Sequence, residues 1–333
     1  MLYSTTTKHK YMIIYTYDMG KEYPNVEFGE LVKYANKARK NRRIKFYENK
    51  EPREINWNAY TLSQIEEAKE VLLFIKNAVD NCILPSRKAG RPTDYKSLAK
   101  AILICEALGF TERKAQGWLE LLGPFAGIDE KLDDRVIGKA YNKPEVAFIL
   151  KQVFDKSKTS DGKLIGDGSG LETSRKQNYG LSKKSTKEFL TSIIDSREIV
   201  QAFDFSGKDE CRAMHSLIEE VEGDSLRLDS GFNDRELVRE ILENGMLPYV
   251  YPKKNNNING SSAWREMYLE FFMDVISWLT EYYQRSHCES FHSAFKRVFG
   301  LLSKIGTHSK FVQVIARIIL HNRARLSYFN KAE

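Results

Sequence analysis

Cysteine is scarce in this chain, and long hydrophobic runs are absent from it. Four cysteines in 333 residues are too few for a disulfide-stapled scaffold, and no Cys-x-x-Cys pair suggests a zinc ribbon. No apolar stretch approaches the roughly 20 residues of a membrane span. Residues 1–20 lack the apolar core and the cleavage site of a signal peptide. We therefore expect a protein of a reducing compartment, the cytoplasm, with no membrane partner.

Positive charge is concentrated in one part of the chain. Lys and Arg number 52 against 45 Asp and Glu, which gives a formal net charge of +7. Residues 31–50 contain eight basic residues and one acidic residue, so this block alone accounts for the excess. A local basic block favours a polyanionic partner, and a solvated linker is the alternative. Arg39, Arg42 and Arg43 are its candidates for DNA phosphate contacts.

The first half of the chain is expected to be mostly helical. Residues 1–60 form a basic appendage, and residues 61–155 form a helical region that we predict to bind DNA. Apolar residues at helical spacing predict helices over 61–80, 95–108 and 111–122. The last two helices are compatible with a helix-turn-helix, and equally with any other helical hairpin.

After residue 160 the pattern changes to short apolar strands separated by helices. Strands are expected over 163–165, 189–194, 198–205, 225–228 and 247–251. Helices are expected over 209–221, 234–243 and 264–300. The order β-β-β-α-β-α-β-α predicts an α/β fold with a mixed sheet and helices on its faces. It resembles the ribonuclease H-like fold, which we assign to residues 156–333.

Two aspartates follow strand cores in similar contexts. Asp167 is followed by Gly-Ser-Gly and Asp229 by Ser-Gly. Ligands of open α/β sheets gather at strand ends, and small residues would leave room for a substrate backbone. The alternative is an ordinary aspartate that opens a turn. Asp204 is a rival acid, but it lies on the predicted hairpin and has the poorer context.

Four polar residues follow the fifth strand at helical spacing. They are Tyr282, Arg285, Glu289 and Lys296. Their offsets of three, four and seven place them on one face of a helix. The pattern Tyr-x2-Arg-x3-Glu-x6-Lys resembles the signature of DDE transposases of prokaryotic insertion sequences, in the insertion sequence 4/5-like group. The segments LIGDGSG, LRLDSGFNDRELV and LPYVYPKKN are also similar to that group, so the resemblance covers about residues 160–325.

The resemblance implies a metal-dependent catalytic site. Asp167, Asp229 and Glu289 would be its catalytic residues and the ligands of two Mg²⁺ or Mn²⁺ ions. Two ions roughly 4 Å apart can activate an attacking oxygen and stabilise a leaving oxygen, and Mg²⁺ prefers carboxylate oxygens. We expect the three carboxylates to lie about 4–8 Å apart without metal.

Three neighbours of this set are candidates for DNA contacts. Arg285 would orient Glu289 or hold a phosphate bidentately. Lys296 would contact the terminal phosphate of a transposon end. Tyr282 would pack in the core or contact DNA.

The function implied by the resemblance is DNA transposition. The enzyme would bind the terminal inverted repeats of double-stranded DNA, cleave the strands and transfer the freed 3′-OH to target DNA. A homodimer would pair the two ends, in the cytoplasm of a prokaryote and at the nucleoid when bound to DNA. A domesticated or inactive DNA-binding protein of the same fold is the main alternative, and a simple metal-dependent nuclease is a third possibility.

Some features argue against other interpretations. The 59 residues between Asp229 and Glu289 leave no room for the large β domain that some relatives insert there. Cys288 and His292 share a helical face, but no second ligand pair appears in the sequence, so a zinc site is disfavoured there. Trp264 is expected to pack in the core, with stacking on a flipped base as the alternative.

Overall fold

The structure is a computed structural model that describes most of the chain. It describes residues 55–84, 93–174, 187–207, 209–253 and 261–332, together with residues 33, 36, 37, 40 and 256. The three predicted DNA contacts of the basic block, Arg39, Arg42 and Arg43, lie outside the described residues.

The N-terminal part of the described chain is helical, as predicted. Its helices are α3 (Trp57–Ile65), α4 (Glu67–Asp80), α5 (Tyr95–Leu108), α6 (Glu112–Leu122), α7 (Asp134–Ala140) and α8 (Pro144–Lys156). The predicted helix over 61–80 consists of two helices that meet at Glu66. Helix α5 has the predicted bounds because Asp94 caps its first turn and Gly109 ends it in the left-handed conformation, with φ 61°.

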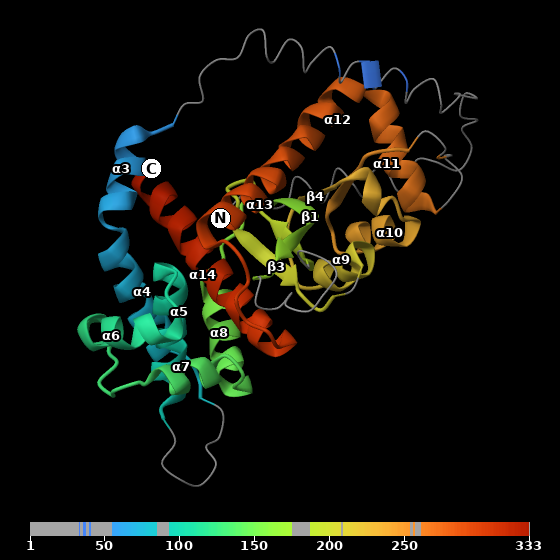
Figure 1. Ribbon diagram of the computed structural model, residues 1–333. Coiled ribbons are helices and arrows are strands. Elements are labelled where there is room, and N and C mark those ends of the chain that lie inside the picture. The colour runs from blue at the N-terminus through green and yellow to red at the C-terminus, as the bar shows by residue number, and fades with distance from the viewer. Residues whose placement is uncertain are drawn as a thin grey trace.

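A five-stranded mixed sheet forms the centre of the molecule (Figure 1). Its strands are β1 (Lys163–Glu172), β2 (Lys187–Ile194), β3 (Val200–Asp204), β4 (Ser225–Leu228) and β5 (Leu247–Val250). The spatial order is β3-β2-β1-β4-β5. Strands β1, β2 and β3 pair antiparallel, whereas β4 pairs parallel with both β1 and β5. The α/β class and the predicted order of strands and helices are confirmed.

The first strand is much longer than predicted. The sequence indicated residues 163–165, because the glycines that follow are typical of a turn. In the structure β1 continues to Glu172, since each residue from Ile165 onward pairs with β2. Cross-strand pairing therefore outweighs the weak strand propensity of glycine.

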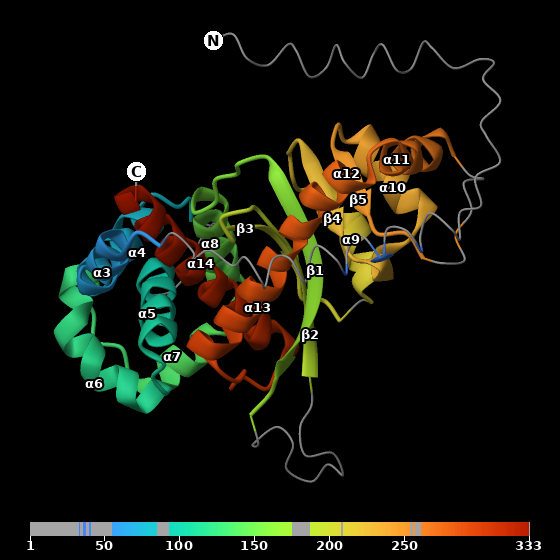
Figure 2. The same cartoon turned by 90° about the horizontal axis from the view of Figure 1, so that it is seen from above.

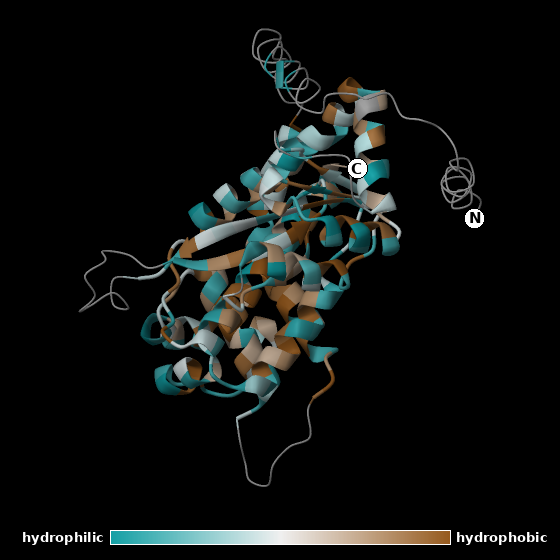
Figure 3. Ribbon diagram, turned by 90° about the vertical axis from the view of Figure 1, so that its right-hand side faces the viewer, coloured by the Kyte–Doolittle hydropathy of each residue, from teal (hydrophilic) through white to brown (hydrophobic). Residues whose placement is uncertain are grey.

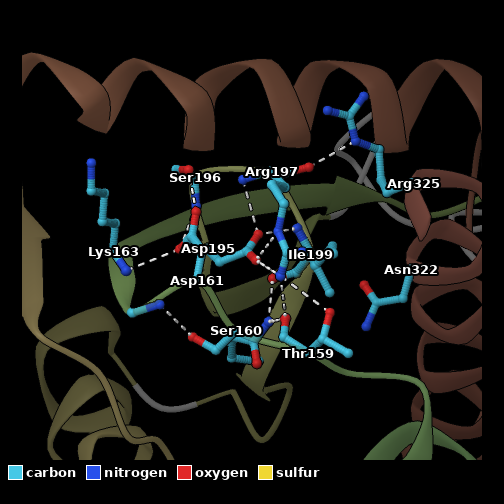
Figure 4. A network of polar contacts seen from close by, with 12 residues as sticks. Thr159, Ser160, Asp161, Lys163, Asp195, Ser196, Arg197, Ile199, Asn322 and Arg325 are labelled. Atoms are coloured by element: carbon cyan, nitrogen blue, oxygen red, sulfur yellow. Dashed lines mark hydrogen bonds and ion pairs between the residues drawn. The ribbon is translucent and has the colours of Figure 1, made fainter. Parts of the chain in front are cut away.

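The predicted hairpin turn at Asp195 joins β2 to β3. Asp195 is fully buried, and its carboxylate accepts hydrogen bonds from the backbone N–H groups of Arg197 and Ile199 (Figure 4). Arg325 of the last helix donates to the carbonyl oxygen of Arg197 at 2.8 Å. Asn322 donates to the carbonyl of Val200 and accepts from its N–H. These bonds hold the end of the hairpin against the C-terminal helix.

The described residues after β3 form six α-helices. They are α9 (Glu210–Ile218), α10 (Arg235–Glu243), α11 (Ser262–Met273), α12 (Val275–Tyr282), α13 (Ser286–Phe299) and α14 (Thr307–Ala332). The prediction of one helix over 264–300 is wrong. Asp274 interrupts it, since its side chain accepts from the N–H groups of Ile276 and Ser277 and thereby starts a new helix. A 3-10 turn, Tyr283–Arg285, separates α12 from α13.

Hydrophobic cores cover both faces of the sheet. Side chains alternate along β1, so Leu164 belongs to the core beneath α9 and α10, while Ile165 belongs to the core beneath α13 and α14. Figure 2 shows α13 and α9 on opposite sides of β1. In Figure 3 the hydrophobic segments gather where the helices meet the sheet and one another.

The core on the α13 side also includes the N-terminal helices. It runs without interruption from Ile75 of α4 through Leu190 of β2 to Leu320 of α14. The boundary predicted between residues 155 and 156 therefore does not separate two cores. Among the described helices, none combines the length and the apolar composition that crossing a membrane requires.

Candidate active site

Two of the predicted carboxylates lie side by side in the sheet. The parallel pairing of β1 with β4 ends where Gly166 faces Leu228. Asp167 and Asp229 are the next residues on the two strands. They therefore occupy the carboxyl edge of the parallel pair, which is the usual place for ligand-binding residues in such sheets. Asp167 itself stays within β1, because it still pairs with Ser192 of β2.

The glycines around Asp167 serve packing rather than substrate access. Gly166 and Gly168 alternate with Asp167 and face the opposite side of the sheet. A Cβ atom on Gly166 would lie 2.6 Å from the side chain of Leu228, and one on Gly168 would lie 2.5 Å from that of Glu210. The space beside Gly168 is therefore filled by Glu210, whereas a Cβ on Gly231, after Asp229, would meet open space. Gly166 and Gly168 allow α9 and β4 to approach β1 closely.

Arg285 lies between Asp167 and the third predicted carboxylate. Its Nη2 atom donates to Oε1 of Glu289 at 2.5 Å, and its Nη1 atom lies 3.7 Å from Oδ2 of Asp167. The Arg285 side chain is only 14% exposed, whereas that of Glu289 is 60% exposed. Arg285 thus connects the strand β1 with helix α13, and Glu289 lies at the solvent side of the group.

The charged groups around Arg285 determine the pKa of its guanidinium. Burial by itself would lower the pKa of the guanidinium. The neighbouring groups Tyr282, Asp229, Glu289 and Asp167 outweigh that effect and hold the pKa above its ordinary value. Arg285 is therefore a permanent positive charge shared among the three carboxylates.

Burial dominates the behaviour of Asp167. It raises the pKa of Asp167 to about 6, although the N–H of Gly168 and the charge of Arg285 oppose the change. The negative charges of Asp229 and Glu210 raise this pKa further. Loss of solvation is thus the main cause of this raised pKa, and the neighbouring carboxylates add to it.

Tyr282 holds Asp229 from a buried position. Its ring is 2% exposed and stacks on Trp278 with 5.3 Å between the ring centroids. Its hydroxyl donates to Oδ1 of Asp229 at 3.4 Å. Of the two roles expected for Tyr282, its buried ring therefore has the packing role. Trp264 is also packed, at 2% exposure, as the sequence led us to expect.

Lys296 extends the group along β1. Its Nζ atom donates to Oγ of Ser169 at 2.6 Å, and the side chain is exposed to solvent. Ser169 lies two residues after Asp167 and therefore on the same face of β1. The site thus continues from the carboxylates to an exposed cation two turns farther along α13.

The donor set suits a hard divalent cation, although the carboxylates are not gathered around one point. Within the described residues, Asp167, Asp229 and Glu289 do not form a group in which all ligand atoms lie within 4.8 Å of one another. Arg285 lies between Asp167 and Glu289 instead. The three carboxylates offer the oxygen ligands that Mg²⁺ or Mn²⁺ prefers. Asp204 lies on the edge strand β3 and bonds to Ser206, outside this group.

The sequence missed two contacts of Asp167. Cys288 and His292 approach it from α13, and one ligand atom of each residue lies within 4.8 Å of the others. Burial lowers the pKa of His292 to about 4, so the ring is neutral. The spacing of Cys288 and His292 was visible in the sequence, but their neighbour Asp167 lies about 120 residues away on another element. Glu210 was missed for the same reason.

Comparisons of the chain with protein-family models, with curated proteins and with solved structures found no match in any of the three.

Proposed function

We propose that this protein is a DDE transposase with a ribonuclease H-like catalytic domain. The observation that carries the proposal is that Asp229 lies beside Asp167 at one sheet edge and that Arg285 links Asp167 to Glu289. The order β3-β2-β1-β4-β5, with three antiparallel strands followed by two parallel ones, supports the fold assignment.

The three carboxylates would hold the divalent ions. When bound, such ions activate the attacking oxygen and stabilise the leaving oxygen of a phosphodiester. The residues around them position the substrate. Tyr282 restrains Asp229 by its hydrogen bond, and Lys296 presents its ammonium group for a DNA phosphate at the solvent side of α13. Arg285 is a bidentate donor that can bind a phosphate in place of Glu289.

The N-terminal region would bind the ends of the element. Helix α6 buries Ala115 and Leu119 and leaves Arg113 and Lys114 exposed. A helix that follows a short turn and exposes two basic residues in its first turn is compatible with major-groove binding. The basic block would add affinity that does not depend on sequence, through contacts between its arginines and DNA phosphates.

A paired measurement tests the catalytic assignment. Glu289→Gln and Asp229→Asn keep the shape of each side chain but remove the charge that holds a hard cation. Each should abolish Mg²⁺-dependent cleavage of DNA that carries the element's own ends, while gel-shift affinity without metal persists. Glu243→Gln is a matched control, because Glu243 lies on α10 and pairs with Arg239. Parental cleavage by Glu289→Gln would remove Glu289 from the catalytic set.

The products of the same assay separate the alternatives. Joining of the cleaved 3′ end to target DNA supports a transposase, whereas cleavage without joining indicates a nuclease. Loss of binding and cleavage together in a folded Glu289→Gln protein would favour a DNA-binding protein without catalysis.

For the basic block, replacing Arg39, Arg42 and Arg43 by Gln should flatten the slope of log affinity against log salt by roughly one unit per lost phosphate contact. An unchanged slope would support the solvated-linker interpretation.

A further inference from the structure

A second group of metal-ligating side chains lies on the other side of the sheet from α13. Cys211 and His215 are one helical turn apart on α9, and Asp234 caps the start of α10. The Sγ atom of Cys211 lies 3.9 Å from Oδ2 of Asp234, and Nε2 of His215 lies 3.8 Å from the same oxygen. All three residues are partly exposed, so an ion can reach them from solvent.

We propose that Cys211, His215 and Asp234 bind one Zn²⁺ ion that ties α9 to α10. In a tetrahedral zinc site the metal lies about 2.3 Å from sulfur and about 2.0–2.1 Å from nitrogen or oxygen. These bond lengths place neighbouring ligand atoms about 3.3–3.5 Å apart. The observed distances of 3.8 and 3.9 Å are therefore within about half an ångström of the bound geometry. A water molecule would complete the coordination.

A carboxylate behind the histidine strengthens this assignment. The Nδ1 atom of His215 lies 2.6 Å from Oε2 of Glu240 on α10. A carboxylate only accepts hydrogen bonds, so Nδ1 donates to Glu240, and Nε2, which faces Asp234, is the ring nitrogen left for a metal. Zinc-binding histidines commonly have such a carboxylate partner, which fixes the tautomer and orients the ring. Glu240 therefore prepares His215 for metal binding before any ion arrives.

The remaining atoms of the group are also arranged for a cation. Oδ1 of Asp234 accepts the N–H of Glu236, which leaves Oδ2 toward Cys211 and His215. Burial raises the pKa of Cys211, and the charges of Asp234 and Asp209 raise it further, so the metal-free thiol keeps its proton. Zinc would replace that proton, which passes to solvent as the thiolate–metal bond forms. Thiolate and imidazole ligands favour zinc over magnesium.

The experiment uses the full chain with Co²⁺ as a spectroscopic probe and Zn²⁺ as its competitor. One equivalent of Co²⁺ should produce a thiolate-to-metal charge-transfer band, and Zn²⁺ should abolish it. Cys211→Ser should eliminate the band. Glu240→Gln keeps all three ligands and should weaken binding about 10–100-fold, as expected for loss of an outer-shell carboxylate. Glu243→Gln, one turn from Glu240 on the same side of α10, is the matched control and should bind as the parent does.

Three results would overturn the proposal. The first is a charge-transfer band that survives Cys211→Ser. The second is a band that Cys288→Ser abolishes, because the ion would then belong to the group beside Asp167. The third is equal affinity of the Glu240→Gln and Glu243→Gln proteins. The third comparison does not remove a ligand and remains decisive if Cys211→Ser fails to fold. None of these measurements depends on the proposed transposase activity.

Discussion

Replacing Asp167 by asparagine should stabilise the metal-free protein at alkaline pH. The folded protein raises the pKa of Asp167 from an ordinary 3.8 to about 6, chiefly by burial. The folded state therefore binds this proton more tightly than the unfolded state, and stability falls as the pH rises from about 4 through about 6. At 1.36 kcal/mol per pKa unit, the difference corresponds to at most about 3 kcal/mol at pH 8. Asp167→Asn removes this cost, and we expect a gain of about 1–3 kcal/mol.

The assay is chemical denaturation in the presence of a chelator, at pH 8 and at pH 3.5. At the lower pH the aspartate is protonated in the folded state and mostly protonated in the unfolded state, so most of the gain should disappear. Asp204→Asn is the control, because Asp204 lies outside the group and should show no comparable gain. A variant that is less stable than the parent at pH 8, or a gain that does not change with pH, would refute the assignment of a buried carboxylate with a raised pKa at this position. If the predicted gain is observed, the ionised Asp167 carboxylate lowers the stability of the metal-free fold, as is common at functional sites.

Three further changes probe the same edge of the sheet. Lys296→Ala should weaken binding of end DNA without metal and lower the single-turnover cleavage rate, whereas unchanged binding would restrict Lys296 to its contact with Ser169. Gly166→Ala should destabilise the fold by about 1–3 kcal/mol, measured by denaturation, because its Cβ would meet the fully buried side chains of Leu228 and Met214. Gly231→Ala, with open space around the added atom, is its control, and equal effects would contradict the packing argument. Tyr282→Phe keeps the buried ring and should lower the cleavage rate without lowering the melting temperature by more than a few degrees, since the ring packing is kept and the 3.4 Å hydrogen bond to Asp229 is lost.

Local signals in the sequence determined much of the fold. The sequence predicted the bounds of β4 from a short apolar run. It predicted the bounds of α5 from its ends, because caps and glycine stops act within one helical turn. The order of strands and helices could be predicted for the same reason, since each element has its own apolar period. That Asp167 and Asp229 lie close together was expected from the family resemblance, and the parallel pairing of β1 with β4 places them side by side.

Long-range contacts decided the rest. The length of β1 depends on pairing with β2, and the role of Gly168 depends on Glu210 of α9. Neither partner is adjacent in the sequence. Asp274 could be a surface charge within one long helix, or it could cap the start of a second helix. The sequence pattern could not make that choice.

The candidate site shows the same division. Sequence spacing placed Arg285 and Glu289 on one helical face, but only the tertiary structure placed Arg285 between Glu289 and Asp167. Likewise, Cys211 and His215 have the spacing of metal ligands, yet whether they can form a metal site depends on Asp234 and Glu240 at the next helix. A sequence determines which chemical groups a chain carries and how they repeat along each element. The packing of those elements decides which groups share a site, because it brings together side chains that the sequence keeps far apart.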